Sequence, residues 1–264
     1  MQVGWIGLGQ MGAPMALRAL AAGHTVVGHS RRPNPELVAA GAILTSSIRE
    51  AAAQAQVLCV CLFDDAQVHD ALIVQGALAA LRPGAVMALH TTGAPDLMQD
   101  LARAAPEGVR VLDAPFSGTA SVAAEGRLTL LVGGEALTLR QARPVLSSFA
   151  DRIVHVGAQG AGRGLKLINN LLFAAQMTLA DEALEAAAAL GLDRQTTALA
   201  MGQCSGASYA MAKFAGPAPH DLMLAAIKPY LDKDVDVART ALDAVGARLP
   251  LLTAAARWGK DARA

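Results

Sequence analysis

The N-terminal segment constrains the fold more than any other part of the chain. Residues 2–6 have the pattern of a short strand, and they lead into the run Gly7-Leu8-Gly9-Gln10-Met11-Gly12. A helical pattern at 13–22 and a second strand pattern at 25–28 complete a βαβ unit. In this setting the glycines permit a tight turn, close approach of backbone to a pyrophosphate, and packing of helix on strand. The sequence predicts a dinucleotide site at the helix N-terminus; an ordinary glycine-rich turn is the alternative.

The end of the second predicted strand bears on which dinucleotide is bound. Folds that bind NAD usually place Asp or Glu there, where the carboxylate holds the ribose hydroxyls. Here the chain reads His29-Ser30-Arg31-Arg32-Pro33, without a carboxylate. Arg31 could clamp a 2′-phosphate while Ser30 donates a hydrogen bond, with Arg32 beside them. The pattern favours NADP(H) over NAD(H), and two arginines on a solvated turn are the alternative.

Strand and helix patterns alternate through the first part of the chain. Further strand patterns lie at residues 57–62, 85–89, 109–112, 128–132 and 153–156. The first of these is an unbroken apolar run, which is typical of a central parallel strand covered on both sides. The alternation predicts an α/β fold with a Rossmann-type doubly wound parallel sheet. Ligands bind beyond the carboxyl ends of such strands, which is where Leu62-Phe63 and Thr91-Thr92 fall.

Small polar residues follow the strand pattern at 109–112. The run is Asp113-Ala114-Pro115-Phe116-Ser117-Gly118-Thr119. The turn Ser117-Gly118-Thr119 is rich in N–H and hydroxyl donors, which can hold a carboxylate without a strong charge. We expect a small carboxylate-bearing substrate there, and a plain loop is the alternative.

A long helical pattern without a proline begins near Gly160 and reaches Leu190. Apolar residues recur at helical spacing and predict one buried face, formed by Leu165, Ile168, Leu172, Ala175 and Leu179. Lys166 and Asn170 lie one helical turn apart. Buried ammonium and amide groups are costly unless paired, so this pair indicates a functional site. The alternative is a wet face on which both are merely exposed.

The remainder of the chain has only helical patterns, at residues 193–204, 207–214, 219–228, 232–245 and 250–258. We therefore expect an NADP-binding domain at 1–160. Residues 161–264 would form the interdomain helix and an all-helical domain for substrate binding and oligomerisation. Lys233-Asp234 enters one of the last helices. An acidic residue in a first helical turn is common because it interacts favourably with the helix dipole. The pair could therefore be simply the first turn of a helix.

Composition excludes several classes of protein. The 22 basic and 22 acidic residues balance, so there is no field to attract nucleic acid or an anionic membrane. The longest apolar runs are too short to cross a bilayer, and no signal-peptide pattern precedes the first motif. The three cysteines form no CxxC, so neither a disulfide framework nor a zinc site is implied, and we expect no metal. These features favour a cytoplasmic protein.

Four segments together resemble the β-hydroxyacid dehydrogenase family, which includes 3-hydroxyisobutyrate dehydrogenase and several semialdehyde reductases. They are the runs 7–16, 113–119 and 160–170 and the pair Lys233-Asp234, in family order. The resemblance implies an NADP-dependent oxidoreductase that acts on a small hydroxyacid or semialdehyde. It implies that Lys166 is the catalytic acid/base, that Asn170 orients the substrate, and that Ser117 and Gly118 hold its carboxylate. Lys233 and Asp234 would close over the site beside the cofactor.

Thr119 departs from the family pattern, because a glycine commonly stands there and the threonine side chain enters the carboxylate site. Imine reductases share the architecture but generally lack the lysine, so Lys166 disfavours that alternative. A non-catalytic NADP-binding module is a second alternative, and it would have no use for a proton donor. We expect a homodimer or homotetramer, since a short helical domain rich in Ala and Leu leaves apolar surface for a second copy.

Overall fold

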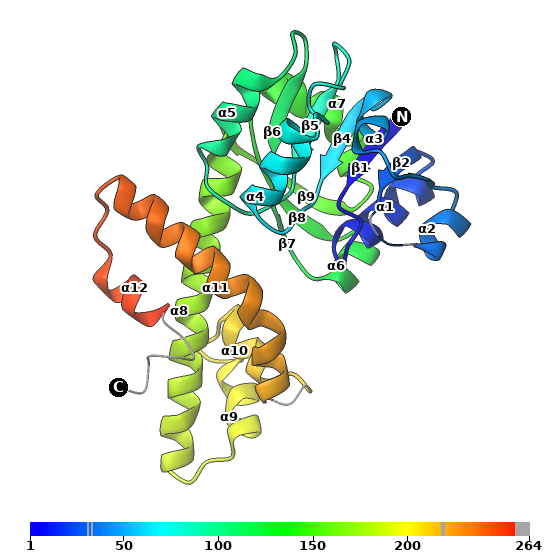
Figure 1. The fold of residues 1–264 in the computed structure, drawn as a ribbon. Coiled ribbons are helices and arrows are strands. Elements are labelled where there is room, and N and C mark those ends of the chain that lie inside the picture. The colour runs from blue at the N-terminus through cyan, green and yellow to red at the C-terminus, as the bar shows by residue number, and fades with distance from the viewer. Residues whose placement is uncertain (31, 33, 218–219, 257–264) are drawn as a thin grey trace. The chain divides into compact units, whose positions relative to one another are not determined.

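A computed structural model describes residues 1–30, 32, 34–217 and 220–256 of the chain. Contacts divide the chain into two compact units, Met1–Lys166 and Leu167–Ala264, and each is described by itself. The helix α8 (Ala161–Ala189) runs through the boundary without a break (Figure 1). The domain limits at 160 and 161 therefore stay a prediction.

The first unit is built on one mixed sheet (Figure 1). Its described strands are β1 (Gln2–Ile6), β2 (Thr25–His29), β3 (Ile43–Thr45), β4 (Val57–Val60), β5 (Val86–Leu89), β6 (Arg110–Asp113), β7 (Phe116–Ser117), β8 (Leu128–Gly133) and β9 (Ala150–Gly157). The first six run parallel in the order β3-β2-β1-β4-β5-β6. This order confirms the Rossmann-type doubly wound fold. The sheet is not parallel throughout, because β8 runs antiparallel to β6 and β7.

Helices cover both faces of the sheet, and each face carries its own apolar cluster. The described helices of this unit are α1 (Gly12–Ala21), α2 (Pro35–Ala39), α3 (Ile48–Ala53), α4 (Asp65–His69), α5 (Leu97–Ala104), α6 (Ala120–Ala124) and α7 (Ala136–Leu146). Strand β4 shows why its sequence is apolar throughout. Val57 and Cys59 enter one cluster, while Leu58 and Val60 enter the other. A strand packed on both faces has no position left for a polar side chain.

Residues 68–81 have the pattern of a helix in the sequence, but the helix in the structure ends earlier. After α4 the chain forms a π-helical segment, Asp70–Val74, and the helix then ends. Gly76 follows with φ of 75°, a left-handed conformation that glycine adopts readily and that stops a helix. Helix α3 is capped by Ser47, whose hydroxyl accepts the Glu50 N–H at 3.3 Å.

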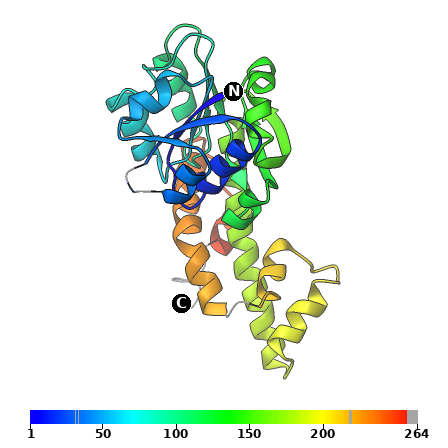
Figure 2. The same ribbon diagram turned by 90° about the vertical axis from the view of Figure 1, so that its right-hand side faces the viewer.

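The second unit is helical in its described part and packs around α8. Its other helices are α9 (Arg194–Met201), α10 (Tyr209–Phe214), α11 (His220–Ala244) and α12 (Pro250–Ala255), several of which lie along α8 in both views (Figure 1, Figure 2). The prediction of two separate helices at 219–228 and 232–245 is wrong, because α11 is continuous through Pro229. Leu231, Val235 and Ala238 are buried just beyond the proline, and this packing offsets the hydrogen bond that it removes.

The face of α8 that is buried is not the one predicted. Leu165, Ile168, Leu172 and Leu179 are between 40% and 57% exposed, and only Ala175 of the predicted set is buried. The core instead contains Leu167, Leu171, Ala174, Met177 and Leu184. This helix is apolar on more than one side, so periodicity alone could not decide which side its neighbours would cover. In the described parts of the chain, no helix is both long and apolar enough to cross a membrane.

Candidate active site

The turn between β1 and α1 places its three glycines in different surroundings. Gly7 has φ of 91°, and a Cβ there would lie 2.1 Å from the Cys61 carbonyl oxygen. A Cβ on Gly12 would lie 1.9 Å from the Gly7 carbonyl oxygen. A Cβ on Gly9 would meet nothing within 4 Å. The fold itself therefore needs Gly7 and Gly12, while Gly9 leaves open space above the backbone between them. The intervening Leu8, Gln10 and Met11 complete the turn.

The segments that follow β4 and β5 are tied to each other at the carboxyl edge of the sheet. The Thr91 hydroxyl accepts the Leu62 N–H at 3.0 Å, and Thr91 is buried. The Asp65 carboxylate, at the start of α4, accepts the Ala94 N–H at 2.8 Å. Thr92 is half-buried and Phe63 is exposed at the same edge. Of the predicted cofactor contacts here, Thr91 has a structural role in joining the two loops.

In the segment after β2, Ser30 is half-buried and Arg32 is exposed. Ser30 donates its hydroxyl to the Arg32 carbonyl oxygen at 2.6 Å and accepts the Arg32 N–H at 3.4 Å. Such local bonds are typical of serine turns. Arg31, the residue expected to clamp a 2′-phosphate, lies outside the described residues.

Asp113 at the end of β6 holds the first turn of α8. Its carboxylate is fully buried and accepts the N–H groups of Gly160 and Arg163, each at 2.8 Å. These are backbone donors that a helix start leaves without intrahelical partners. A Cβ on Gly162 would lie 2.3 Å from the Leu131 carbonyl oxygen, so the helix starts in close contact with β8. No local pattern indicates the bonds of Asp113 to this turn, because they join residues 47 and 50 positions apart.

Arg163 is a buried residue that the sequence analysis did not single out. Its side chain is 0% exposed and forms an ion pair with Asp65. Its Nε and Nη1 groups have no acceptor among the described residues. An arginine between glycines at a helix start has the pattern of a solvated residue, so composition offered no signal for its burial.

The predicted carboxylate turn is partly a strand. Ser117 belongs to β7 and pairs with Thr129 of β8. Gly118 has φ of 138°, and a Cβ there would lie 2.5 Å from a Leu128 methyl carbon. Thr119 stands at the start of α6, and its hydroxyl lies 2.8 Å from that of Ser121. Ser117, Gly118 and Thr119 are all exposed, so their polar groups lie at the surface of the first unit.

The structure brings together three of the predicted polar residues in the helical unit. Asn170 donates its side-chain amide to Asp234 at 2.6 Å, and Asp234 pairs with Lys233 at 2.7 Å. Asn170 and Asp234 are buried. The alternative in which Lys166 and Asn170 are both merely exposed is therefore wrong. Asn170 is buried and paired, and Lys166, a turn earlier on α8, is half-buried.

The reading of Lys233-Asp234 as an ordinary first helical turn is also wrong. Helix α11 begins at His220, about three and a half turns before the pair. The pair lies in the middle of the continuous α11, where Asp234 accepts the Asn170 amide of α8. The helix-start reading depended on the break that the sequence suggested at Pro229.

His90, next to Thr91, is a buried titratable group. Its Nδ1 lies 2.8 Å from the Ala114 carbonyl oxygen, which can only accept, so Nδ1 carries the proton. The ring lies near those of Trp5 and Phe149. Burial lowers the pKa of His90 to about 4, and the hydrogen bond to Ala114 opposes that shift only partly. The imidazole is therefore neutral at pH 7.

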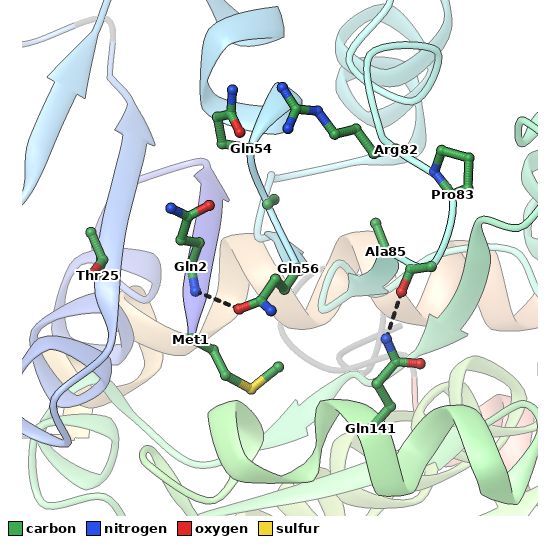
Figure 3. A pocket seen from close by; sticks show the side chains of 11 residues that line it. Met1, Gln2, Thr25, Gln54, Gln56, Arg82, Pro83, Ala85 and Gln141 are labelled. Carbon is green, nitrogen blue, oxygen red and sulfur yellow. Dashed lines mark hydrogen bonds between the residues drawn. The ribbon is translucent and has the colours of Figure 1, made fainter.

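A hollow of about 770 Å³ lies at the opposite edge of the sheet, where the parallel strands begin (Figure 3). Two of the side-chain amides that line it, those of Gln56 and Gln141, are hydrogen-bonded within the protein. The Gln2 N–H donates to the Gln56 side-chain oxygen at 2.9 Å, and the Gln141 amide donates to the Gly84 carbonyl at 2.6 Å. The predicted cofactor contacts after β1, β2, β4 and β5 lie at the carboxyl edge instead, so this hollow is separate from them.

Family comparisons cover nearly the whole chain. Residues 2–157 match the family described as the NAD binding domain of 6-phosphogluconate dehydrogenase. Residues 160–264 match the family described as NAD-binding of NADP-dependent 3-hydroxyisobutyrate dehydrogenase. The chain is thus an NAD(P)-binding oxidoreductase with a Rossmann fold.

Individual relatives show to which family of oxidoreductases the chain belongs. A probable 3-hydroxyisobutyrate dehydrogenase of Mycobacterium tuberculosis is 35% identical over 260 residues, which are 94% of this chain and 88% of that protein. An NAD-dependent L-serine dehydrogenase of Pseudomonas aeruginosa is 34% identical over 95% of this chain and 88% of that one. The solved M. tuberculosis 3-hydroxyisobutyrate dehydrogenase with L-serine has a TM-score of 0.85 at 33% identity, covering 97% of this chain and 91% of the other. The chain belongs to the β-hydroxyacid dehydrogenase family, as its motifs indicated.

Two further matches give weaker evidence about the function of this chain. An uncharacterized oxidoreductase of M. tuberculosis is 36% identical over 73% of this chain, but the match spans 66% of that protein, just under two thirds. An imine reductase from Pseudomonas sp. has a TM-score of 0.65 over 96% of this chain and 90% of that one, at 20% identity. That likeness shows a shared fold alone.

Proposed function

We propose that this protein transfers hydride between NADP(H) and a small β-hydroxyacid or its semialdehyde, with Lys166 as general acid/base. The observation that carries the proposal is the arrangement on α8. Lys166 lies one turn from Asn170, and the amide of Asn170 is held by the buried Asp234. A proton donor beside a fixed amide is the arrangement that a carbinol–carbonyl interconversion needs. Family membership supports the reaction class.

Each residue has a distinct role in the proposal. When bound, a nicotinamide cofactor would provide the hydride chemistry at the carbon that changes between carbinol and carbonyl. Lys166 accepts the hydroxyl proton during oxidation and donates it during reduction. An amide nitrogen carries two hydrogens, so Asn170 can give one to Asp234 and the other to the substrate oxygen. Ser117, Gly118 and Thr119 hold the carboxylate with backbone and hydroxyl donors.

The proposed cofactor contacts are those predicted from the sequence, except that Thr91 and Asp234 are given an indirect role. We assign the phosphates to the Gly7–Gly12 turn, and further contacts to Leu62, Phe63, Thr92 and Lys233. Thr91 and Asp234 act indirectly, because their side chains hold Leu62 and Asn170. Preference for NADP(H) is proposed from Ser30, Arg31 and Arg32. The family description names an NADP-dependent enzyme, whereas one relative is named NAD-dependent, so the preference belongs to this chain's own residues.

The cofactor preference is tested by titration of the apoprotein with NADPH and NADH. Arg31→Ala removes a charge-assisted contact of about 1.5–3 kcal/mol, so NADPH affinity falls by roughly one to two decades while NADH affinity is unchanged. Equal affinity of the wild type for both cofactors contradicts the assignment.

The role of Lys166 is tested by Lys166→Ala. We expect turnover to fall by about 10²–10⁴-fold with NADPH binding intact, because a positioned acid acts in the transition state. Arginine does not rescue, since its pKa is too high for it to release a proton. Lys213→Ala, whose ammonium lies over the Tyr209 ring, is the matched control and retains turnover. A Lys166→Ala variant with wild-type kcat and only a raised KM would make the lysine a carboxylate anchor.

We also propose that the protein is at least a homodimer. The supporting observation is the exposed apolar row on α8, formed by Leu165, Ile168, Leu172 and Leu179. A row of this kind is a typical self-association surface. Light scattering should give a mass at least twice 27.0 kDa, and Leu172→Asp with Leu179→Asp should reduce it. The monomer mass for the wild type at working concentration rules out the dimer.

A further inference from the structure

The Asp65–Arg163 ion pair is unusual because one of its members is completely buried. Arg163 is 0% exposed on its side chain and Asp65 is 31% exposed. Two further nitrogen atoms of the guanidinium, Nε and Nη1, lack acceptors among the described residues. Burial of unpaired donors on a charged group destabilises a protein, and replacing such a pair by apolar side chains is often neutral or stabilising. Stability alone therefore does not explain the pair.

The surroundings of the pair are adapted to it. A Cβ on Gly93 would lie 2.1 Å from both the Arg163 Nη2 and an Asp65 oxygen. Any other residue at Gly93 would displace the guanidinium or the carboxylate. The loop after β5 therefore leaves space for this one contact, which is an observation independent of the ion pair itself.

The pair connects three segments of the first unit. One Asp65 oxygen contacts Arg163, and the other accepts the Ala94 N–H at 2.8 Å. The loop that contains Ala94 also holds the segment after β4 through the bond between Thr91 and Leu62. Arg163 lies in the first turn of α8, three residues before Lys166. The same turn is fixed at its backbone by Asp113.

We propose that Asp65 and Arg163 are positioning residues, which set Lys166 against the loops after β4 and β5. The proposal rests on the proposed function, because those loops carry the cofactor contacts and Lys166 carries the proton. Neither residue touches the reacting atoms. Asp113 fixes where α8 begins, and the ion pair fixes the helix relative to the loop after β5. Misplacement of a reacting group by about 1 Å can cost about 10²-fold in rate.

The test compares single, double and conservative variants by steady-state kinetics. Arg163→Met should lower kcat by roughly 10- to 100-fold, with the NADPH dissociation constant within about threefold of wild type. Arg163→Lys retains the charge beside Asp65 and should recover part of the loss. Gly93→Ala, which displaces the pair and removes neither partner, should also lower kcat. Arg110→Met, whose partner Glu135 is exposed in the same unit, is the control and should retain wild-type kcat.

A double variant separates positioning from stability. Arg163→Met with Asp65→Asn removes both charges, so its thermal midpoint should recover relative to Arg163→Met alone. The rate should remain low in the double variant, because the loop and α8 are still not connected. Recovery of kcat together with the midpoint, or wild-type kcat in Arg163→Met, overturns the proposal.

A structural measurement keeps this inference distinct from the proposed function. In Arg163→Met we expect faster amide hydrogen exchange in residues 91–95 and 160–164 than in the wild type. Unchanged exchange in both segments overturns the positioning role. If the wild type turns over no hydroxyacid or semialdehyde, the proposed function fails, while the exchange result still decides whether the pair holds these segments.

Discussion

Asp113 and Asp234 each bury a carboxylate against α8, one in the sheet unit and one in the helical unit. Asp113 accepts two backbone N–H groups from the start of the helix. Asp234 accepts a side-chain amide, that of Asn170, in the middle of it. A carboxylate that binds backbone determines where a helix begins, whereas one that binds a side chain determines only how that side chain points. We therefore expect loss of Asp113 to damage the fold and loss of Asp234 to damage the reaction.

The largest effect is expected for Asp113→Ala. The substitution leaves two buried backbone donors unpaired and removes a buried charge that caps α8, so the free energy of unfolding should fall by about 3–5 kcal/mol. Urea unfolding at neutral pH measures it. Asp100→Ala, at an exposed ion pair on α5, should change the same quantity by less than about 0.5 kcal/mol. A loss at Asp113 as small as that at Asp100 would remove the distinction between the two carboxylates.

A second prediction concerns the stability of the sheet unit at acidic pH, which we expect to depend on His90. Burial lowers the pKa of His90 to about 4 from an ordinary 6.5. Between these values the unfolded chain binds the proton and the folded protein does not, so stability falls as pH falls through this window. The expected loss is about 3 kcal/mol.

The measurement is urea unfolding of wild type and His90→Asn at several pH values between 4 and 6.5. The smaller side chain lowers the stability of the variant at every pH, so the difference in slope between the two proteins is the quantity that decides. His69→Asn, at an exposed histidine, is the control and should keep the wild-type slope. Parallel curves for wild type and His90→Asn would contradict the prediction.

Asp234→Ala should have a smaller effect on stability. One charge-assisted hydrogen bond contributes about 1.5–3 kcal/mol, and α11 remains anchored through its apolar face. Activity should fall more than stability suggests, because Asn170 loses the acceptor that orients it. Asp236→Ala, two positions away at an exposed site, is the control. Wild-type kcat and KM in Asp234→Ala would show that Asn170 does not need to be held.

The same contrast explains how much the sequence could predict. Strands β1, β2, β4, β5 and β6 and the turn at Gly7–Gly12 follow from local patterns, because a buried strand and a glycine turn leave marks within a few residues. The Asp113 cap, the burial of Arg163 and the antiparallel β8 depend on contacts between distant segments, which no local pattern records. On α8 the apolar spacing was correct for a helix but not for its buried face, since α8 is apolar on several sides. The polar pair Lys166 and Asn170 was found because few polar residues interrupt that helix.

The proposed reaction is hydride transfer between NADP(H) and a small β-hydroxyacid or its semialdehyde. The most direct measurement is NADPH absorbance in a panel of short β-hydroxyacids, semialdehydes and cyclic imines, with wild type and Lys166→Ala side by side. We expect the wild type to turn over at least one hydroxyacid–semialdehyde pair and to reduce none of the imines. In the variant the rate should be lower by about 10²-fold or more. Reduction of an imine at equal rates by both proteins, without turnover of any hydroxyacid or semialdehyde, would contradict it.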